Sequence, residues 1–214
     1  MFGNHPRKLW PRARSPRFLT VTRRGAGRSW LRARVVVPLA LLLAGIAGVS
    51  GYHHWLYPFG HRVGCMPNTL GALSYYAREH QGWYPRDGAT PLVCLQAFYP
   101  KYLGAELAGI TGDRGEVLRR LERQQSIDDT VSSWMYFPEL RFDDDPEIAL
   151  IWERRGGVTV NGHRDDGHAV GFVDGSVRQI SSGEWPDFTR RQAELRQRVL
   201  STRNSGQAAQ KQAE

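Results

Sequence analysis

The longest uninterrupted run of apolar residues lies near the N-terminus of the chain. Residues 35–52 contain no charged side chain, and a helix of this length covers about 27 Å, close to the thickness of a bilayer core. Trp55 and Tyr57 follow the run, as aromatic residues do at a membrane interface. The pattern predicts a transmembrane helix over residues 35–56. A cleaved signal peptide is the alternative, because the small residues 48–51 resemble a cleavage site.

Beyond residue 56 the spacing of apolar positions changes from one segment to the next. Spacing typical of amphipathic helices occurs in these segments: 67–80, 90–103, 115–125 and the first part of 186–214. Short runs rich in β-branched and aromatic residues predict strands: 132–137, 147–153, 158–160, 168–173 and 176–180. Asp174-Gly175, between the last two runs, is the strongest hairpin signal. The predicted fold class is α+β, with a transmembrane helix before a domain of helices and a small antiparallel sheet.

The charge of the chain is concentrated at one end. The chain has 29 Lys and Arg against 21 Asp and Glu, but residues 1–34 hold about ten of the basic residues and no acidic one. The net positive charge of the chain therefore comes from residues 1–34 and not from the domain that follows. We expect no specific nucleic-acid partner. Because basic segments stay on the cytoplasmic side, we predict a disordered cytoplasmic arm over 1–34 and an exported domain over 57–185. Residues 186–214 are predicted to begin as a helix and to end as a disordered tail.

Small residues repeat along the predicted membrane helix. Ala40, Ala44 and Gly48 are four residues apart, so they share one helix face, where a neighbouring backbone can approach closely. This stripe predicts contact with another membrane helix. The alternative is that small residues merely fill the span.

Both cysteines, Cys65 and Cys94, belong to the predicted exported part. Two cysteines in an oxidising compartment favour a disulfide between them. The alternative is two buried free thiols, because spacing alone does not define the geometry that a disulfide needs.

One polar cluster carries candidate metal chemistry. His163, Asp165, Asp166 and His168 lie within six residues, and imidazole and carboxylate groups at this spacing can hold a divalent metal ion. The alternative is a solvated loop between strands. The sequence contains no Gly-x-Ser-x-Gly, His-Glu-x-x-His or phosphate-loop motif, so it indicates no other catalytic chemistry.

Two sets of motifs follow one another over about residues 60–180. The first is Arg62-x-x-Cys65-x-x-Asn68-x-Leu70-x-x-Leu73-x-x-Tyr76, followed by Gly82-Trp83-Tyr84-Pro85. The second is Ser133-Trp134-Met135-Tyr136, then Asp144-Asp145-Pro146, then Phe172-Val173-Asp174-Gly175-Ser176-Val177. In this order, after a membrane helix, the motifs resemble the type IV pilin-like proteins called pseudopilins, in the branch with a C-terminal His-x9-Asp-Gly motif. The resemblance implies a pseudopilin-like exported domain.

The chain departs from the pseudopilin pattern at two points. Nothing like the family's Gly followed by Phe-Thr-Leu-Ile-Glu precedes Val35, and the apolar run contains no Glu. Ten residues separate His163 from Asp174, so Arg164 occupies the place of the motif's His. Because the processing site and the Glu serve filament assembly in that family, we expect a fixed accessory subunit.

Two functions follow from these patterns. The first is a structural or interaction subunit in the bacterial inner membrane, with a periplasmic domain. Its partners would be the lipid bilayer and other membrane-protein subunits, which it would contact through the membrane helix and the exported domain. The second is a membrane-tethered, metal-dependent periplasmic enzyme built on the polar cluster at residues 163–168. Convergence of those side chains around one cavity would favour the enzyme.

Overall fold

The computed structural model describes the backbone of residues 26–62 and 65–213. The chain divides into two units, Met1–Gly48 and Val49–Glu214. The predicted disordered arm lies outside the described residues over 1–25. Over residues 26–34 the prediction of disorder was wrong, because these residues form the start of α1, which begins at Ala26.

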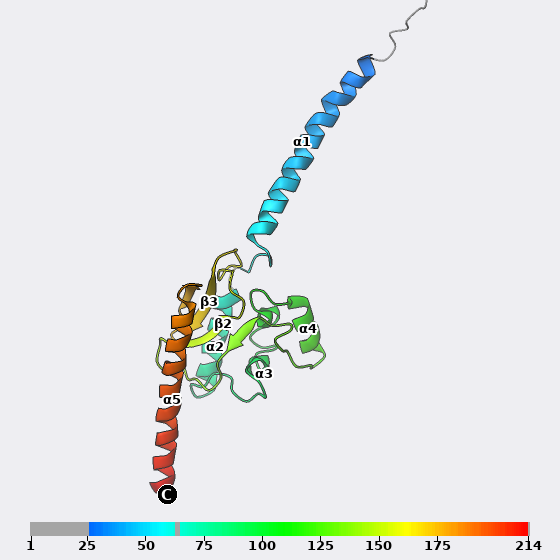
Figure 1. Cartoon of the computed structure of the whole chain (residues 1–214). Coiled ribbons are helices and arrows are strands. Elements are labelled where there is room, and N and C mark those ends of the chain that lie inside the picture. The colour runs from blue at the N-terminus through cyan, green and yellow to red at the C-terminus, as the bar shows by residue number, and fades with distance from the viewer. Residues whose placement is uncertain (1–25, 63–64, 214) are drawn as a thin grey trace, which may run out of the picture. The chain divides into compact units, whose positions relative to one another are not determined.

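The first helix, α1 (Ala26–Leu56), contains the predicted membrane segment (Figure 1). Its section from Arg34 to Leu56 is long and apolar enough to cross a membrane, a criterion that a signal sequence also meets. The large apolar side chains of this section are exposed on all sides of the helix, from Val35 to Trp55. An N-terminal apolar helix is therefore confirmed, with a start nine residues earlier than the apolar run itself.

Helices of the second unit precede its sheet: α2 (Cys65–Glu79), α3 (Pro91–Gln96), the 3-10 helix η1 (Ala105–Ala108) and α4 (Arg114–Glu122). Thr90 and Asp113 cap α3 and α4, because their side chains accept hydrogen bonds from backbone N–H groups of the first turn. The helix predicted over 90–103 is shortened to α3. Pro100 lies within that range and cannot donate a helical hydrogen bond.

Within the described residues, the sheet has strands β1 (Trp134–Tyr136), β2 (Ala149–Glu153), β3 (Gly167–Phe172) and β4 (Val177–Ser181). They pair antiparallel in chain order. The predicted hairpin is confirmed: β3 and β4 meet at Asp174-Gly175, where Gly175 has φ +82°, a conformation that glycine adopts without strain. The strand predicted over 158–160 is not formed, because Val158 makes only an isolated bridge to Arg164.

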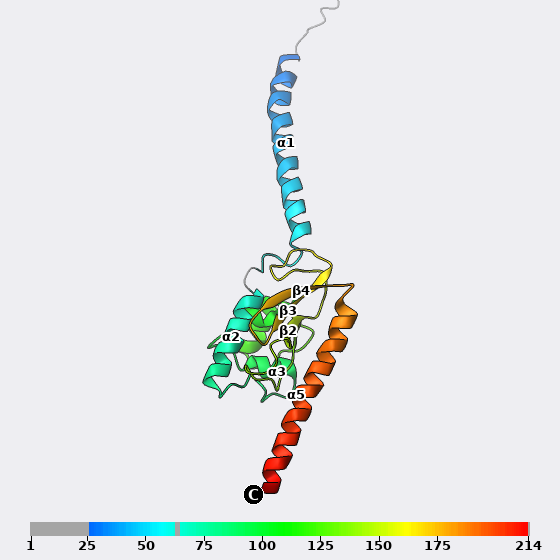
Figure 2. The same cartoon turned by 90° about the vertical axis from the view of Figure 1, so that its left-hand side faces the viewer.

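Helices α2 and α5 (Trp185–Ala213) cover opposite faces of the sheet (Figure 2). Phe188 of α5 packs on Phe172 of β3. On the other face, atoms of the Leu70 side chain of α2 lie within 2.9 Å of where a Cβ at Gly171 would be, so a larger residue here would require Leu70 to shift. The prediction that residues 186–214 end in a disordered tail was wrong, because α5 continues as a helix to Ala213.

Candidate functional site

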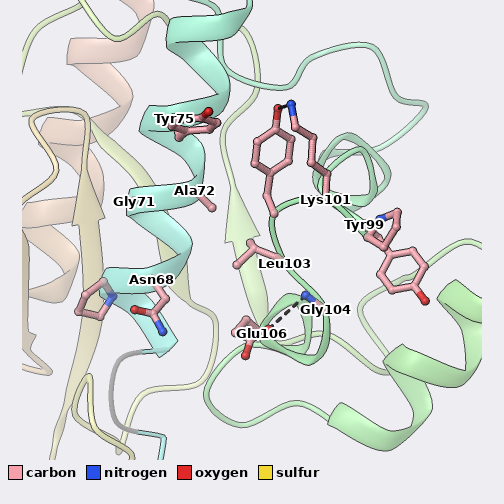
Figure 3. Close-up of a pocket in the computed structure, with 12 residues that line it drawn as sticks. Asn68, Gly71, Ala72, Tyr75, Tyr99, Lys101, Leu103, Gly104 and Glu106 are labelled. Carbon is pink, nitrogen blue, oxygen red and sulfur yellow. Dashed lines mark hydrogen bonds between the residues drawn. The ribbon is translucent and has the colours of Figure 1, made fainter.

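A groove of about 750 Å³ lies between α2 and the segment 99–106 (Figure 3). We call it the α2 groove. Its α2 side is built from residues that share one exposed helix face: Pro67, Asn68, Gly71, Ala72 and Tyr75. Its other side is formed by the backbone and side chains of the segment: Tyr99, Pro100, Lys101, Tyr102, Leu103, Gly104 and Glu106. Helical periodicity explains the first side, because these positions alternate with the buried face of α2.

A charged network fixes one end of the α2 groove. Lys101 Nζ donates to Glu79 Oε2 at 2.7 Å, and it lies 2.8 Å from the Tyr102 hydroxyl oxygen. The Tyr102 hydroxyl also donates to Glu79. Hydrogen bonds from Lys101 and Tyr102 lower the pKa of Glu79, and the hydrogen bonds of Lys101 to Glu79 and Tyr102 raise the pKa of Lys101. The network connects the segment 99–106 to α2, so side chains from both sides of the groove define this end of it.

The other end of the α2 groove is fixed by Glu106. Its carboxylate accepts hydrogen bonds from Gly104 N–H at 3.1 Å and from the Arg114 guanidinium at 3.0 Å. Burial opposes ionisation of Glu106, but its hydrogen bonds to backbone N–H groups and to Arg114 outweigh burial and lower its pKa. Glu106 therefore keeps its charge while shaping the loop.

The α2 side of the groove leaves open space at Gly71. A Cβ added there would meet no atom of the described residues within 4 Å, its own helix and chain neighbours aside. Tyr75, one turn further along α2, is mostly exposed, and its ring lies 5.8 Å from that of Tyr102. The surface therefore combines a flat helix face with an aromatic edge, features that suit a protein segment.

A second polar site is closed to solvent. Glu153, at the end of β2, is fully buried. Its carboxylate accepts hydrogen bonds from Ile110 N–H at 2.9 Å, Ser133 Oγ at 2.8 Å and Thr111 Oγ1 at 2.7 Å. Burial raises its pKa, and the three donors oppose that rise. Glu153 thus ties β2 to the residue before β1 and to the loop before α4. Sequence reasoning missed it, because a Glu ending an apolar strand looks like a solvated terminus.

The residues of the predicted metal cluster do not come together. His168 lies on the face of β3 that packs against α5, where its ring stacks on Trp185 at 3.8 Å. Asp165 and Asp166 are exposed in the preceding loop. His163 instead lies 2.6 Å from the Tyr57 hydroxyl oxygen. Among the described residues, no three His, Cys, Asp or Glu side chains are grouped to hold a metal ion, so the predicted four-residue site is not formed.

The two cysteines are free and buried in this structure. Cys65 Sγ, at the start of α2, points toward Glu106 O at 4.0 Å, and Cys94 Sγ, in α3, points toward Gly88 O at 3.8 Å. Burial raises the pKa of Cys65 to about 11 and also raises that of Cys94. The disulfide considered from the sequence is therefore not formed, and the alternative of two buried thiols describes the structure.

The predicted helix stripe lies on the surface of α1. Ala40, Ala44 and Gly48 are all exposed. A Cβ at Gly48 would meet no described atom within 4 Å beyond its own helix and chain neighbours. The three positions are therefore accessible to another helix, and contact with one stays a prediction.

Comparison with known proteins finds no matching family model, curated protein or solved structure. The pseudopilin resemblance therefore stays a prediction based on motifs. Several of those motif residues serve the core: Leu70 and Leu73 are buried on α2, and Trp134 and Tyr136 are buried on β1.

Proposed function

We propose that this protein is a membrane-anchored structural or interaction subunit, an accessory component of a larger bacterial envelope complex. One observation carries the proposal: the large apolar side chains of α1 from Val35 to Val49 are more than half exposed. A surface of this kind is unfavourable in water and favourable in lipid. The chain would span the inner membrane once and carry the second unit on its far side.

The orientation follows from charge. Residues 1–34 are basic and hold no acidic residue, so they stay in the cytoplasm, and the domain from residue 57 onward lies in the periplasm. Trp55 and Tyr57 would then lie at the outer interface.

The α2 groove is the surface through which the exported domain would bind an extended segment of another membrane-protein subunit. Tyr75 offers apolar area with little rotamer freedom to lose, and Asn68 offers an amide that can pair with a peptide backbone (Figure 3). Lys101 and Glu106 at the two ends are both held in ion pairs. The groove therefore presents a shape that is defined before binding, which lowers the entropy cost of association.

Fusions to alkaline phosphatase test the anchor and its orientation. A fusion after Gly60 should be active and a fusion before Arg34 inactive, because the enzyme folds only outside the cytoplasm. The full-length protein should also stay in the membrane pellet after carbonate extraction. The reverse fusion pattern would contradict the orientation, and release by carbonate would contradict the anchor.

A substitution that fills the groove without touching the core tests the binding surface. Gly71→Leu adds a side chain where the described residues leave space, and leucine favours a helix over glycine by about 1 kcal/mol. Co-purification in mild detergent should show a partner that the wild type retains and Gly71→Leu loses. Gly115→Leu, at an exposed position of helix α4 outside the groove, is the matched control and should retain it. Equal retention by both variants would contradict the role of the groove.

A further inference from the structure

A cluster of aromatic and imidazole rings lies at the C-terminal end of α1, within the unit Val49–Glu214. His53 Nε2 lies 2.9 Å from His61 Nε2. The ring of Tyr57 is 3.9 Å from that of His61 and 5.1 Å from that of His53. His163 also contacts Tyr57, with ring centroids 4.2 Å apart. His53 and His61 therefore face one another through the same ring nitrogen and are joined by a hydrogen bond.

Backbone contacts hold the chain around this cluster. Arg164 N–H donates to Leu56 O at 2.9 Å, and the Arg164 guanidinium donates to Trp55 O at 3.3 Å. Arg62 N–H donates to Asn161 O at 3.1 Å. Arg164 thus supplies both hydrogen bonds and positive charge to the end of α1, where free carbonyl groups favour them. The segments that carry His53, His61 and His163 are tied together by their main chains.

We propose that His53 and His61 bind a divalent transition-metal ion, with copper(II) preferred. Metal–imidazole bonds are about 2.0 Å long, so two nitrogens at 90° around a metal lie about 2.8–2.9 Å apart. The nitrogens of His53 and His61 are already 2.9 Å apart as partners in a hydrogen bond, and the metal ion would take the place of the proton between them, which is released to solvent. A tetrahedral ion needs about 3.3 Å between two such ligands, so the pair matches square-planar or tetragonal geometry better. Imidazole ligands and that geometry favour Cu²⁺ and Ni²⁺, and the affinity order favours Cu²⁺.

The neighbouring rings position the ligands. Tyr57 packs against both imidazoles, and its hydroxyl is held by His163. These ring contacts limit how far the imidazoles of His53 and His61 can turn. Both ligand rings are exposed, so each can turn its lone pair toward the ion without disturbing the core. Because the described residues offer no third grouped ligand, water completes the coordination and the ion exchanges readily.

The test uses the full-length protein in detergent, purified with a tag that lacks histidine. Titration with Cu²⁺ should show one saturable site, and its electron paramagnetic resonance spectrum should show tetragonal copper with two equivalent imidazole nitrogens. His53→Gln or His61→Gln should each weaken this binding on the order of a hundredfold, because one imidazole alone loses the chelate advantage. His54→Gln is the matched control, since His54 is exposed on the same helix turn, and it should leave the binding unchanged.

Two further measurements separate this site from copper bound elsewhere, including the N-terminal arm. His53→Gln combined with His61→Gln should abolish the two-nitrogen signal, and any copper that remains should show a different spectrum. Ca²⁺ should not displace the copper, because calcium prefers oxygen ligands. Wild-type affinity and an unchanged spectrum in the double variant would overturn the proposal. Equal loss of binding in His54→Gln would overturn it too.

Discussion

The backbone N–H of Ala149 in β2 donates a 2.8 Å hydrogen bond to the side-chain oxygen of Gln192 in α5. The Gln192 amide nitrogen donates in turn to Glu147 O at 2.9 Å. The register of β2 against β3 shifts between Ala149 and Ile151, and Gln192 provides both hydrogen-bonding groups beside this irregularity. One glutamine therefore joins α5 to a central strand where the pairing between strands is interrupted.

Removing this amide should destabilise the domain. We expect Gln192→Ala to lower the free energy of unfolding by about 1–3 kcal/mol, because it leaves the buried Ala149 N–H without its acceptor. Urea denaturation of the detergent-solubilised protein, followed by tryptophan fluorescence, measures the change. Gln197→Ala, at an exposed position of the same helix, should cost less than about 0.5 kcal/mol. Equal effects of the two variants would contradict the role of Gln192.

The buried carboxyl of Glu153 should make stability depend on pH. Burial raises its pKa above the ordinary value of 4.5, so the folded state binds the proton more tightly than the unfolded state. This contribution to stability is fully present below pH 4.5 and is lost as the pH rises through the raised pKa. The surface carboxyls Asp143 and Glu147, whose pKa values are lowered by Arg141 and Arg178 respectively, act in the opposite sense.

Comparison with Glu153→Gln isolates this contribution, because glutamine cannot titrate and can keep most of the hydrogen bonds. The unfolding free energy of the wild type minus that of the variant should decrease from pH 4 to pH 7. Urea denaturation curves across this range provide the measurement. A difference that is constant with pH, or that grows toward pH 7, would show that the pKa of Glu153 is not raised by folding.

The two cysteines should behave as buried thiols. Cys65, with its pKa raised to about 11, and Cys94 should both resist a maleimide at pH 7.5 in the folded protein, because the thiolate is the reactive form. After denaturation without reductant, mass spectrometry should show two labels. Zero labels under those conditions would instead demonstrate a Cys65–Cys94 disulfide.

The small-residue stripe of α1 can be tested separately from the fold. We expect Ala44→Leu combined with Gly48→Leu to leave membrane insertion intact and to release a helix partner, because the larger side chains hold a neighbouring backbone away. Leu42→Ala changes volume outside the stripe and should retain the partner. Co-purification in mild detergent compares the variants. Retention of every partner by the double variant would mean that α1 is only an anchor.

Local patterns predicted the regular elements well. The apolar run of α1 and the Asp174-Gly175 hairpin depend on residues a few positions apart, so a short window of sequence is enough to predict each of them. The limits of elements were less predictable. Residues 186–214 lose their apolar periodicity toward the end, yet α5 continues to Ala213. The first half of this helix packs on the sheet, and the helix extends from there.

Only the tertiary structure decided which polar residues meet. His168 looked like a partner of Asp165 in sequence, but alternation along β3 turns it toward Trp185, away from the exposed loop. His53 and His61 were eight residues apart without a motif, and the turn after α1 brings their nitrogens within 2.9 Å. Sequence determines local periodicity through the backbone's own geometry. Contacts between elements depend on how all faces pack at once, which no short segment contains.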